Sequence, residues 1–385
     1  MHAKDLVRTA KKALISQSIS IQNYTQDDCQ IAFHATTNSL MQTIRFMHIF
    51  FSLLGIISSV LFVKVLMSGN ARHVHVNLRI SLSSLSIAAL LACLQLCFIA
   101  IYHLGLTFTA ENACDVIYEA KQCALLRFPL VLSIYATLCG IIVLAIERTI
   151  ATAKYKSYEV HGSKVVAVSL VTCQWVISIF FAAVSVLLRA DPGYVHYCTP
   201  YVSHPRSSVF SLCVMSLLEL STLVYFVVLM QMNQHRQVNE FVNNAMHTLT
   251  ERYQLQENVK TMRILIPSIT VHAVLGFVGL SSMLAFAVFH RSVEERLIVR
   301  FAPFSEIVLL VIPVYAIVFS LVAVYRNQQL RHVARKTLPW LFNTDDNSSV
   351  RLIAHKDTVI VSRPSKQIEA DSDTHFDLLN EMWKK

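Results

Sequence analysis

The sequence predicts an all-α membrane protein built as a bundle of seven transmembrane helices. Three observations predict this fold class: seven long apolar runs, an unusually apolar composition, and basic residues gathered mainly on one side of those runs. Hydrophobic residues make up 54% of the 385 and charged residues only 15%, with a mean hydropathy of +0.50. Ordinary soluble proteins are less apolar and more charged, so most of the chain is expected to lie in a lipid bilayer.

Each apolar run is about 20 to 25 residues long, which is enough for a helix to cross a hydrocarbon core of about 30 Å. Backbone polar groups must pair internally in lipid, and runs this long and continuous favour helices over barrel strands. Together they define a seven-transmembrane domain at residues 44–325. The predicted spans are residues 44–67, 78–103, 123–146, 164–188, 207–230, 264–289 and 303–325.

Three further regions flank this domain. Residues 1–43 contain no secretory signal and are predicted to form an extracellular segment. Residues 326–342 are predicted to form an amphipathic helix on the inner leaflet, and residues 343–385 a flexible cytoplasmic tail. The amphipathic pattern sets apolar residues against basic ones: Leu330, Val333, Ala334, Leu338 and Trp340 against Arg331, Arg335 and Lys336.

The orientation follows from the positive-inside rule. Lys and Arg near the span ends are more numerous on the side that includes Arg148, Lys260 and Arg326 than on the side that includes Arg45 and Arg206. The C-terminus is therefore predicted to be cytoplasmic and the N-terminus outside. The net charge of +9 is accounted for by this placement beside the bilayer, and no nucleic-acid partner is predicted.

The third inner loop, at about residues 231–263, has a helical pattern of its own. Its apolar residues recur at spacings of three and four: Val238, Phe241, Val242, Ala245, Met246, Leu249 and Tyr253. This predicts that spans five and six extend as helices into the cytoplasm, where an extended sixth helix would act as a lever. A helix lying on the membrane surface remains the alternative.

Four of the nine cysteines, Cys29, Cys114, Cys123 and Cys198, fall on the outer, oxidising side. The pair Cys123 and Cys198 is favoured, because one begins the third span and the other lies in the loop between spans four and five. Cys29 with Cys114 is then the remaining and weaker pair, since four cysteines allow three connectivities. No Cys/His spacing indicates a metal site, and no dinucleotide or phosphate-binding glycine motif indicates a cofactor. Asn23 begins an Asn-x-Thr sequon in the segment predicted to be outside, so it is expected to carry a glycan.

Ionisable residues inside spans are costly and are candidates for function. Arg127 and Glu306 lie at similar depths near the outer ends of spans three and seven. They are predicted either to pair across the mouth of the bundle or to bind a charged ligand group, with separate headgroup anchoring as the alternative. Glu219 lies near the middle of the fifth span and His272 at a reachable height in the sixth, so we expect these two to interact.

The third span carries a more specific pattern. Cys123 at its outer end is followed 25 residues later by Arg148, within Glu147-Arg148-Thr149, and this resembles the rhodopsin-type receptors coupled to G proteins. The resemblance implies that Arg148 holds the cytoplasmic ends of the bundle closed at rest and contacts the G protein α subunit when released. Glu147 would tune the charge of Arg148 by local pairing. The chain departs from that pattern in the seventh span, which reads Ile312-Pro313-Val314-Tyr315, and Pro313 is expected to kink this helix.

Two inner-loop phrases point to a narrower family. Residues 147–152 with Tyr158-Glu159, and residues 252–258, resemble the nematode serpentine chemoreceptors of the class alpha superfamily, with class alpha/beta the most similar. The resemblance covers about residues 25–340. It implies a plasma-membrane receptor of sensory neurons or their cilia that binds a small environmental molecule in an outer-half pocket and activates a heterotrimeric G protein.

Other classes fit less well. No internal repeat indicates a transporter, and neither His-Glu-x-x-His nor Gly-x-Ser-x-Gly occurs, so an enzyme is not predicted. A seven-helix ligand-gated channel of inverted topology, or another membrane protein that signals without a G protein, is the alternative that remains. An inverted channel would have its N-terminus inside, so the state of Asn23 discriminates between the two topologies.

Overall fold

The computed structural model describes residues 25–69, 74–153, 164–187, 193–198, 205–242, 249–289 and 296–339. Asn23 and the predicted tail at 343–385 lie outside the described residues. Residues 1–337 form one compact unit. Residues 338–385 form a second unit, of which the structure describes only Leu338 and Pro339.

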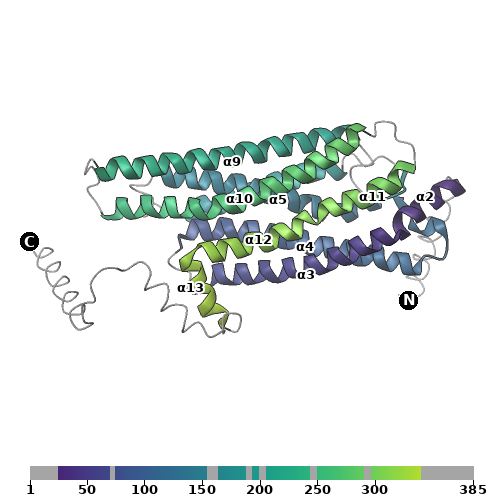
Figure 1. Cartoon of the computed structure of the whole chain (residues 1–385), viewed down its shortest axis with the longest axis horizontal. Helices are drawn as coiled ribbons and strands as arrows, with labels where there is room; N and C mark the ends of the chain where they lie inside the picture. The colour runs from purple at the N-terminus through teal and green to yellow at the C-terminus, as the bar shows by residue number, and fades with distance from the viewer. Residues whose placement is uncertain are drawn as a thin grey trace, which may run out of the picture. The chain divides into compact units, whose positions relative to one another are not determined.

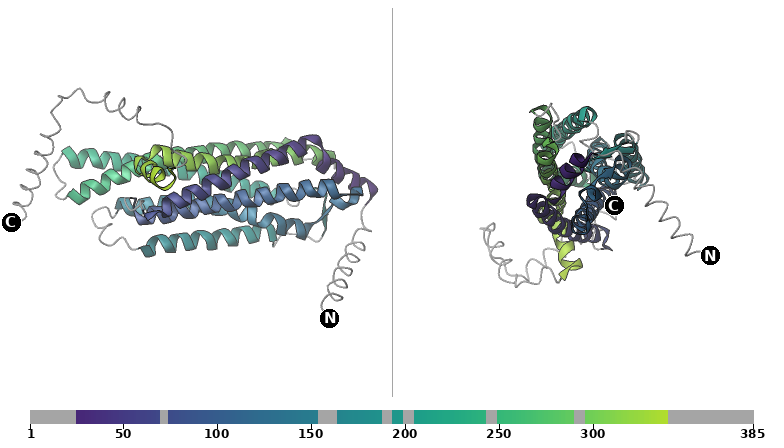
Figure 2. Two further views of the ribbon diagram at one scale, coloured as in Figure 1. Left: turned by 90° about the horizontal axis from the view of Figure 1, so that it is seen from below. Right: turned by 90° about the vertical axis from the view of Figure 1, so that its right-hand side faces the viewer.

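The first unit is an all-α bundle, and the predicted fold class is confirmed. Seven helices are long and apolar enough to cross a membrane, and they run beside one another (Figures 1 and 2). Their candidate spanning parts are Ser39–Met67, Val76–Thr109, Ala120–Ala153, Lys164–Val186, Cys213–Asn239, Asn258–Gly279 and Ala302–Arg326. The remaining regular structure of the described residues lies mainly at the end of the bundle that is predicted to face outward.

The helices that form the bundle are α3 (Ser39–Met67), α4 (Val76–Thr109), α5 (Ala120–Ala153), α7 (Lys164–Ala182), α9 (Pro205–Val242), α10 (Leu249–Phe289), α11 (Arg296–Leu309) and α12 (Val311–Arg326). Helix α7 continues into a π-helical turn, Ala183–Leu187. Packing follows a ring in which α3 contacts α4, α4 contacts α5, α5 contacts α9, α9 contacts α10, α10 contacts α12 and α12 contacts α3. Helix α7 packs against α4 and α5.

Helices α9 and α10 are longer than a membrane requires. They contain 38 and 41 residues, which at 1.5 Å per residue gives about 57 and 62 Å, against a hydrocarbon core of about 30 Å. The two helices run side by side (Figure 1) and leave only residues 243–248 between them outside the described part of the chain. Both therefore extend well past one end of the apolar region, as the helical pattern of the third inner loop predicted.

A buried amide fixes the contact between α7 and its neighbours. Gln174 donates from Nε2 to the carbonyl of Ala136 on α5 (2.8 Å) and accepts from the Ser84 hydroxyl on α4 (3.0 Å). Gly140 makes room for it, because a Cβ at that position would lie 2.9 Å from Nε2 of Gln174. Three helices are thus joined by hydrogen bonds where lipid offers no alternative partner.

The seventh span is broken rather than continuous. Helix α11 ends at Leu309 and α12 begins at Val311, and the amide of Leu310 donates to the carbonyl of Ile307. Pro313 lies in the first turn of α12, where its missing N–H is tolerated, whereas inside a continuous helix its ring would clash with the carbonyl of Leu309. The sequence indicated a kink at Pro313, and the structure places the break three residues before it.

The N-terminal segment contains a helix that the sequence did not indicate, α2 (Gln26–Thr37). Thr25 and Asp28 form a capping box at its start, since the Thr25 hydroxyl accepts from the Asp28 amide and the Asp28 carboxylate accepts from the Thr25 amide. A short 3-10 helix, η2 (Ala113–Val116), follows α4, and strands β1 (Tyr118–Glu119) and β2 (Tyr194–Val195) pair antiparallel. These small elements position the outer site.

Helix α13 (Gln328–Thr337) follows α12 and turns away from the direction of the bundle helices (Figure 1). Asn327 caps it by accepting from the amide of Leu330 (3.2 Å). Its apolar residues Leu330, Val333 and Ala334 are buried against α12 and α3, while Arg335 and Lys336 are exposed. The helix at this place agrees with the amphipathic pattern, and its attachment to the inner leaflet stays a prediction.

Candidate functional site

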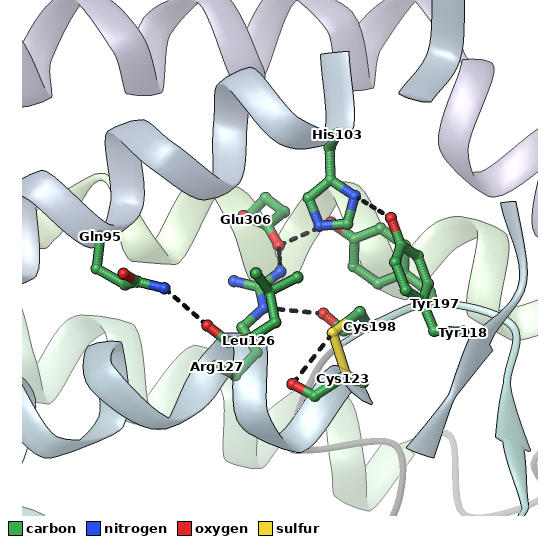
Figure 3. The surroundings of a disulfide bond; sticks show 9 residues. All are labelled: Gln95, His103, Tyr118, Cys123, Leu126, Arg127, Tyr197, Cys198 and Glu306. Carbon is green, nitrogen blue, oxygen red and sulfur yellow. Dashed lines mark hydrogen bonds and ion pairs between the residues drawn. A yellow bond between two sulfur atoms is a disulfide. The ribbon is translucent and has the colours of Figure 1, made fainter. Parts of the chain in front are cut away.

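A disulfide organises the outer end of the bundle. Cys123, in the first turn of α5, is bonded to Cys198, which follows β2, with their Cα atoms 5.4 Å apart. Arg127 lies one turn further along α5, so the bridge brings the carbonyl of Cys198 within 3.0 Å of its Nε, which donates to it (Figure 3). The other outer pair, Cys29 and Cys114, is also bonded and joins α2 to η2. These are the two pairings that the sequence favoured.

Arg127 and Glu306 meet inside the bundle (Figure 3). Nη2 of Arg127 lies 2.6 Å from Oε1 of Glu306, and the Tyr197 hydroxyl donates to the same oxygen at 2.7 Å. His48 of α3 donates from Nε2 to the backbone carbonyl of Glu306 (2.8 Å). All four side chains are buried. A buried ion pair persists only where further hydrogen bonds satisfy both partners, and these contacts do so while joining α3, α5, α11 and the outer loop.

Two more buried side chains extend this cluster towards α2. Arg45 of α3 donates from Nη1 to the Thr36 carbonyl (3.0 Å), the Thr107 hydroxyl (2.9 Å) and the His103 carbonyl (3.4 Å). Nδ1 of His103 is hydrogen-bonded to the Tyr118 hydroxyl at 2.9 Å. We define the outer polar cluster by its members: Arg45, His48, His103, Tyr118, Arg127, Tyr197 and Glu306.

The two tyrosines of this cluster lie outside the candidate spans, and their phenol groups are buried. Burial raises the pKa of Tyr118 above its ordinary value. Burial also raises the pKa of Tyr197, and the neighbouring Glu306 carboxylate raises that pKa further. Both phenols are therefore protonated at neutral pH, which is consistent with Tyr197 donating its proton to Glu306.

Sequence reasoning found Arg127 and Glu306 but missed most of the cluster. Arg45 was counted as an outer span-end cation, although the structure buries it within α3. The available signal was its position at the start of the predicted span with His48 three residues later, because residues at that spacing share a helix face. The sequence favours an ordinary interfacial role over a pocket-lining one for the outer-loop aromatics, Tyr197 among them, and its contact with Glu306 depends on the bridged loop.

The structure also brings Glu219 and His272 together in the middle of the bundle. Nδ1 of His272 lies 2.6 Å from Oε1 of Glu219, as an ion-pair contact between α10 and α9. Gly276 of α10 permits this approach, because a Cβ there would lie 2.5 Å from Oε2 of Glu219. The His272 ring stands edge-on to Tyr315 of α12, with ring centroids 4.4 Å apart. The pair thus connects the fifth, sixth and seventh spans.

At the opposite end of α5, Glu147 and Arg148 form a buried pair. Nε and Nη2 of Arg148 both donate to the carboxylate of Glu147. Arg148 is 2% exposed and Glu147 is 1% exposed. Nη1 of Arg148 lies 3.5 Å from Oδ1 of Asn258 on α10, and Nδ2 of Asn258 donates to the Ala151 carbonyl at 3.2 Å. Asn258 therefore holds α10 against the end of α5.

Helix α9 contacts the same end of α5. The Thr149 hydroxyl is hydrogen-bonded to the Tyr225 hydroxyl, and Asn233 donates from Nδ2 to the Thr152 hydroxyl at 3.0 Å. Arg236 donates to the Thr152 carbonyl at 3.3 Å. We call the contacts of α5 residues 147–152 with α9 and α10 the inner clasp.

The N-cap of α4 is also close to this charge pair. Burial lowers the pKa of His75, and the positive charge of Arg148 lowers that pKa further. Glu147 opposes both effects. A neutral His75 therefore adds no positive charge beside Arg148 at neutral pH.

Comparison with known proteins gives two kinds of match. Residues 26–350 match the family model described as "Serpentine type 7TM GPCR receptor class ab chemoreceptor". The Caenorhabditis elegans protein "Serpentine receptor class alpha/beta-14" is 68% identical over 391 residues, covering all of both chains. "Serpentine receptor class beta-17" of the same organism is 24% identical over 252 residues, which is 63% of this chain and 66% of that protein. The similarity to the class alpha/beta-14 receptor covers the bundle, the outer polar cluster and the inner clasp.

Proposed function

The chain belongs to the class ab family of serpentine seven-transmembrane chemoreceptors, and from this premise we propose that it binds a small environmental molecule and activates a heterotrimeric G protein. Family membership confirms the resemblance inferred from residues 147–152 and 252–258. The ligand is proposed to bind in the outer half of the bundle and the G protein at the end that carries Arg148. The proposed location is the plasma membrane of sensory neurons or their cilia.

The observation that carries this proposal is the burial of Arg148 behind the inner clasp. With 2% of its surface exposed, Arg148 is not accessible to a partner helix in this conformation. Moving α10 away from α5 would break the Arg148–Asn258 and Asn258–Ala151 contacts and uncover the guanidinium. The clasp is therefore suited to a two-state element whose closed form is the one described here.

The energies are suited to a switch. A hydrogen bond contributes about 0.5 to 1.5 kcal/mol net, and one to a charged group about 1.5 to 3 kcal/mol, so the two Asn258 contacts stabilise the closed form by a few kcal/mol. A ligand that binds the open form about 100-fold more tightly supplies a comparable difference. A small molecule can thus shift this equilibrium without unfolding the bundle.

Basal nucleotide exchange tests the proposal. At matched surface expression with co-expressed G proteins, Asn258→Ala is expected to raise agonist-independent exchange at least about tenfold, because each loss of about 1.4 kcal/mol from the closed form changes the populations tenfold. Arg148→Ala is expected to change basal exchange as well, since it removes the buried cation itself.

Asn239→Ala is the matched control. Asn239 is an exposed asparagine of α9 whose side chain is hydrogen-bonded to His235 of the same helix, so its loss should leave exchange unchanged. If wild type and all three variants give the same exchange with several G protein subtypes, coupling through the inner clasp is wrong. Ion flux would then be the next measurement, because the channel alternative predicts it.

A further inference from the structure

Among the residues that the structure describes, three arginines are buried, and they differ in what they bind. Arg45, Arg127 and Arg148 are each 1% to 2% exposed. The Nε and Nη2 hydrogens of a guanidinium point the same way along one edge, and this pair of donors matches the two oxygens of a carboxylate. In Arg148 that edge is occupied by the carboxylate of Glu147. In Arg127 it is occupied by the Cys198 carbonyl and the Glu306 carboxylate.

The same edge of Arg45 has no acceptor among the residues that the structure describes. Its Nε and Nη2 are buried and have no hydrogen-bond partner within the described part of the chain, whereas Nη1 makes three hydrogen bonds. Those bonds to α2 and α4 fix the orientation of the guanidinium. Two other buried atoms of this region, Oγ1 of Thr36 and Oε1 of Gln42, likewise have no partner among the described residues.

The outer polar cluster also carries an excess of positive charge. Arg45 and Arg127 contribute two guanidinium charges, and Glu306 is the only carboxylate among the defined members of the cluster. That carboxylate is paired with Arg127, and no ion pair joins Arg45 to any described Asp or Glu. A buried charge without a counterion costs several kcal/mol, and inside a membrane span such a residue is a candidate for ligand recognition.

We propose that the Nε–Nη2 edge of Arg45 binds the carboxylate of the small-molecule ligand. The inference rests on the proposed function only in taking the bound anion to be the chemosensory ligand. Met41, one turn before Arg45 on α3, is buried in an apolar cluster with Ile44, Tyr197 and Ala302. Apolar side chains thus lie on the turn of α3 that precedes the guanidinium, and the proposed ligand class is a small monocarboxylate with an apolar body.

The last turn of helix α2 contacts this site. The carbonyl of Thr36, in its last turn, accepts from both Arg45 and Gln42. The first half of α2 is held separately, by the Cys29–Cys114 disulfide and by the contact of Asp28 with His196. A carboxylate can therefore reach Arg45 if the last turn of α2 moves while its first half stays attached.

Thermal unfolding of the full-length receptor in detergent tests the site without any signalling readout. The probes are sodium acetate, butyrate and benzoate, compared with butyramide, benzamide and sodium chloride at constant ionic strength. The carboxylates are expected to raise the wild-type Tm saturably by about 2 °C or more, because they bind the folded state. The amides and chloride are expected not to do so, because they lack the two oxygens that match the arginine edge.

Variants locate the effect. Arg45→Gln should abolish the carboxylate shift, and Arg45→Lys should weaken carboxylate affinity about tenfold, because lysine keeps the charge but not the paired donors. Arg263→Gln, at an exposed arginine of α10, should keep the wild-type shift. If Arg45→Gln does not fold, the wild-type contrast of butyrate with butyramide and the Arg45→Lys affinity decide the matter.

Three results would overturn the inference: no shift with any carboxylate, an equal shift with chloride, or an unchanged shift in Arg45→Gln. Its failure can be separated from failure of the proposed function. A carboxylate shift that depends on Arg45, without nucleotide exchange in any variant, supports the site and contradicts G protein coupling. Nucleotide exchange that responds to Asn258→Ala, without a Tm shift by any carboxylate, supports G protein coupling and contradicts the Arg45 site.

Discussion

Two hydrogen bonds and an ion pair converge on Glu306 from three separate parts of the chain. Arg127 of α5 and Tyr197 of the outer loop contact the same carboxylate oxygen, and His48 of α3 donates to the backbone carbonyl. Because the group is buried, the contacts of Arg127 and Tyr197 replace hydration that the carboxylate loses, and His48 does the same for the backbone carbonyl. Removing either Arg127 or Glu306 alone is therefore expected to lower the free energy of unfolding strongly. Replacing both residues together is expected to lower it far less.

This expectation can be measured by a double-mutant cycle on receptor stability in detergent. Glu306→Gln leaves Arg127 buried without its counterion and should lower the free energy of unfolding by about 3 kcal/mol or more. Arg127→Met should cost a similar amount by leaving Glu306 unpaired, whereas the double variant should cost less than the two single changes together. Glu119→Gln, at an exposed residue of β1, is the control. Additive effects in the cycle would show that the pair does not act as one unit.

For single residues, the sequence identifies ionisable side chains that interrupt an apolar run. Arg127, Glu219, His272 and Glu306 were found in this way, because an ionisable group inside a span needs a partner. Tyr197 and Gly276 could not be found, since their roles depend on which elements meet. The loop that carries Tyr197 is placed by a disulfide, and the role of Gly276 follows from the approach of the Glu219 carboxylate.

Helix α2 is a secondary-structure element that could not be predicted from the sequence. Its residues are only weakly amphipathic, so the sequence pattern does not indicate a helix there. The helix is held against η2 and α11 by tertiary contacts and by a disulfide. The break of the seventh span at Leu310 is similar, since Pro313 indicated a bend but not which residue would leave the helix. The long helices of the bundle were predictable because a hydrocarbon environment demands both their length and their composition.

The attachment of α2 is predicted to depend on pH through Asp28. The pKa of this carboxyl is lowered from its ordinary value of 3.8, first by the Thr25 hydroxyl and next by His196, which lies 3.0 Å away. A depressed pKa in the folded state means that the ionised form stabilises the fold. That contribution is fully present above the ordinary value and is lost as pH falls through the depressed one.

Hydrogen exchange of the α2 amides measures this effect. Protection, corrected for intrinsic exchange, should stay constant from pH 6 to about pH 4 and fall below it, where Asp28 takes up a proton. Asp28→Asn should lower protection at pH 6 and remove the decline at acid pH, whereas Asp27→Asn, its exposed neighbour, should behave as wild type. An acid decline that is unchanged in Asp28→Asn would assign the pH dependence to another group.

Helix α5 joins the two ends of the whole bundle. Arg127 near one end and Arg148 near the other are roughly 30 Å apart along it, at 1.5 Å of rise per residue. The Arg127–Glu306 pair joins it to α11, to which His48 of α3 is also hydrogen-bonded, and the inner clasp joins it to α9 and α10. A ligand that alters the outer contacts therefore acts on an element that the inner contacts also hold, which is the arrangement that coupling between two sites requires.

The direction in which the bundle crosses the membrane decides which of these ends faces the cytoplasm, where the proposed G protein would bind. Basic residues are more numerous at the end that carries Arg148, which favours a cytoplasmic location for it. Both disulfides lie at the opposite end, and disulfides form and persist in oxidising compartments. Two independent arguments therefore favour an outside N-terminus, which stays a prediction.

Glycosylation then tests the topology of the entire chain. Asn23 should carry a glycan and Asn347, in the predicted cytoplasmic tail, should not, because glycans are added only on the lumenal side. On gels, glycosidase treatment should increase the mobility of wild type and of Asn347→Gln, and leave Asn23→Gln unchanged. A glycan on Asn347 in place of Asn23 would mean inverted topology, with Arg148 outside and inaccessible to a G protein, and would favour the channel alternative.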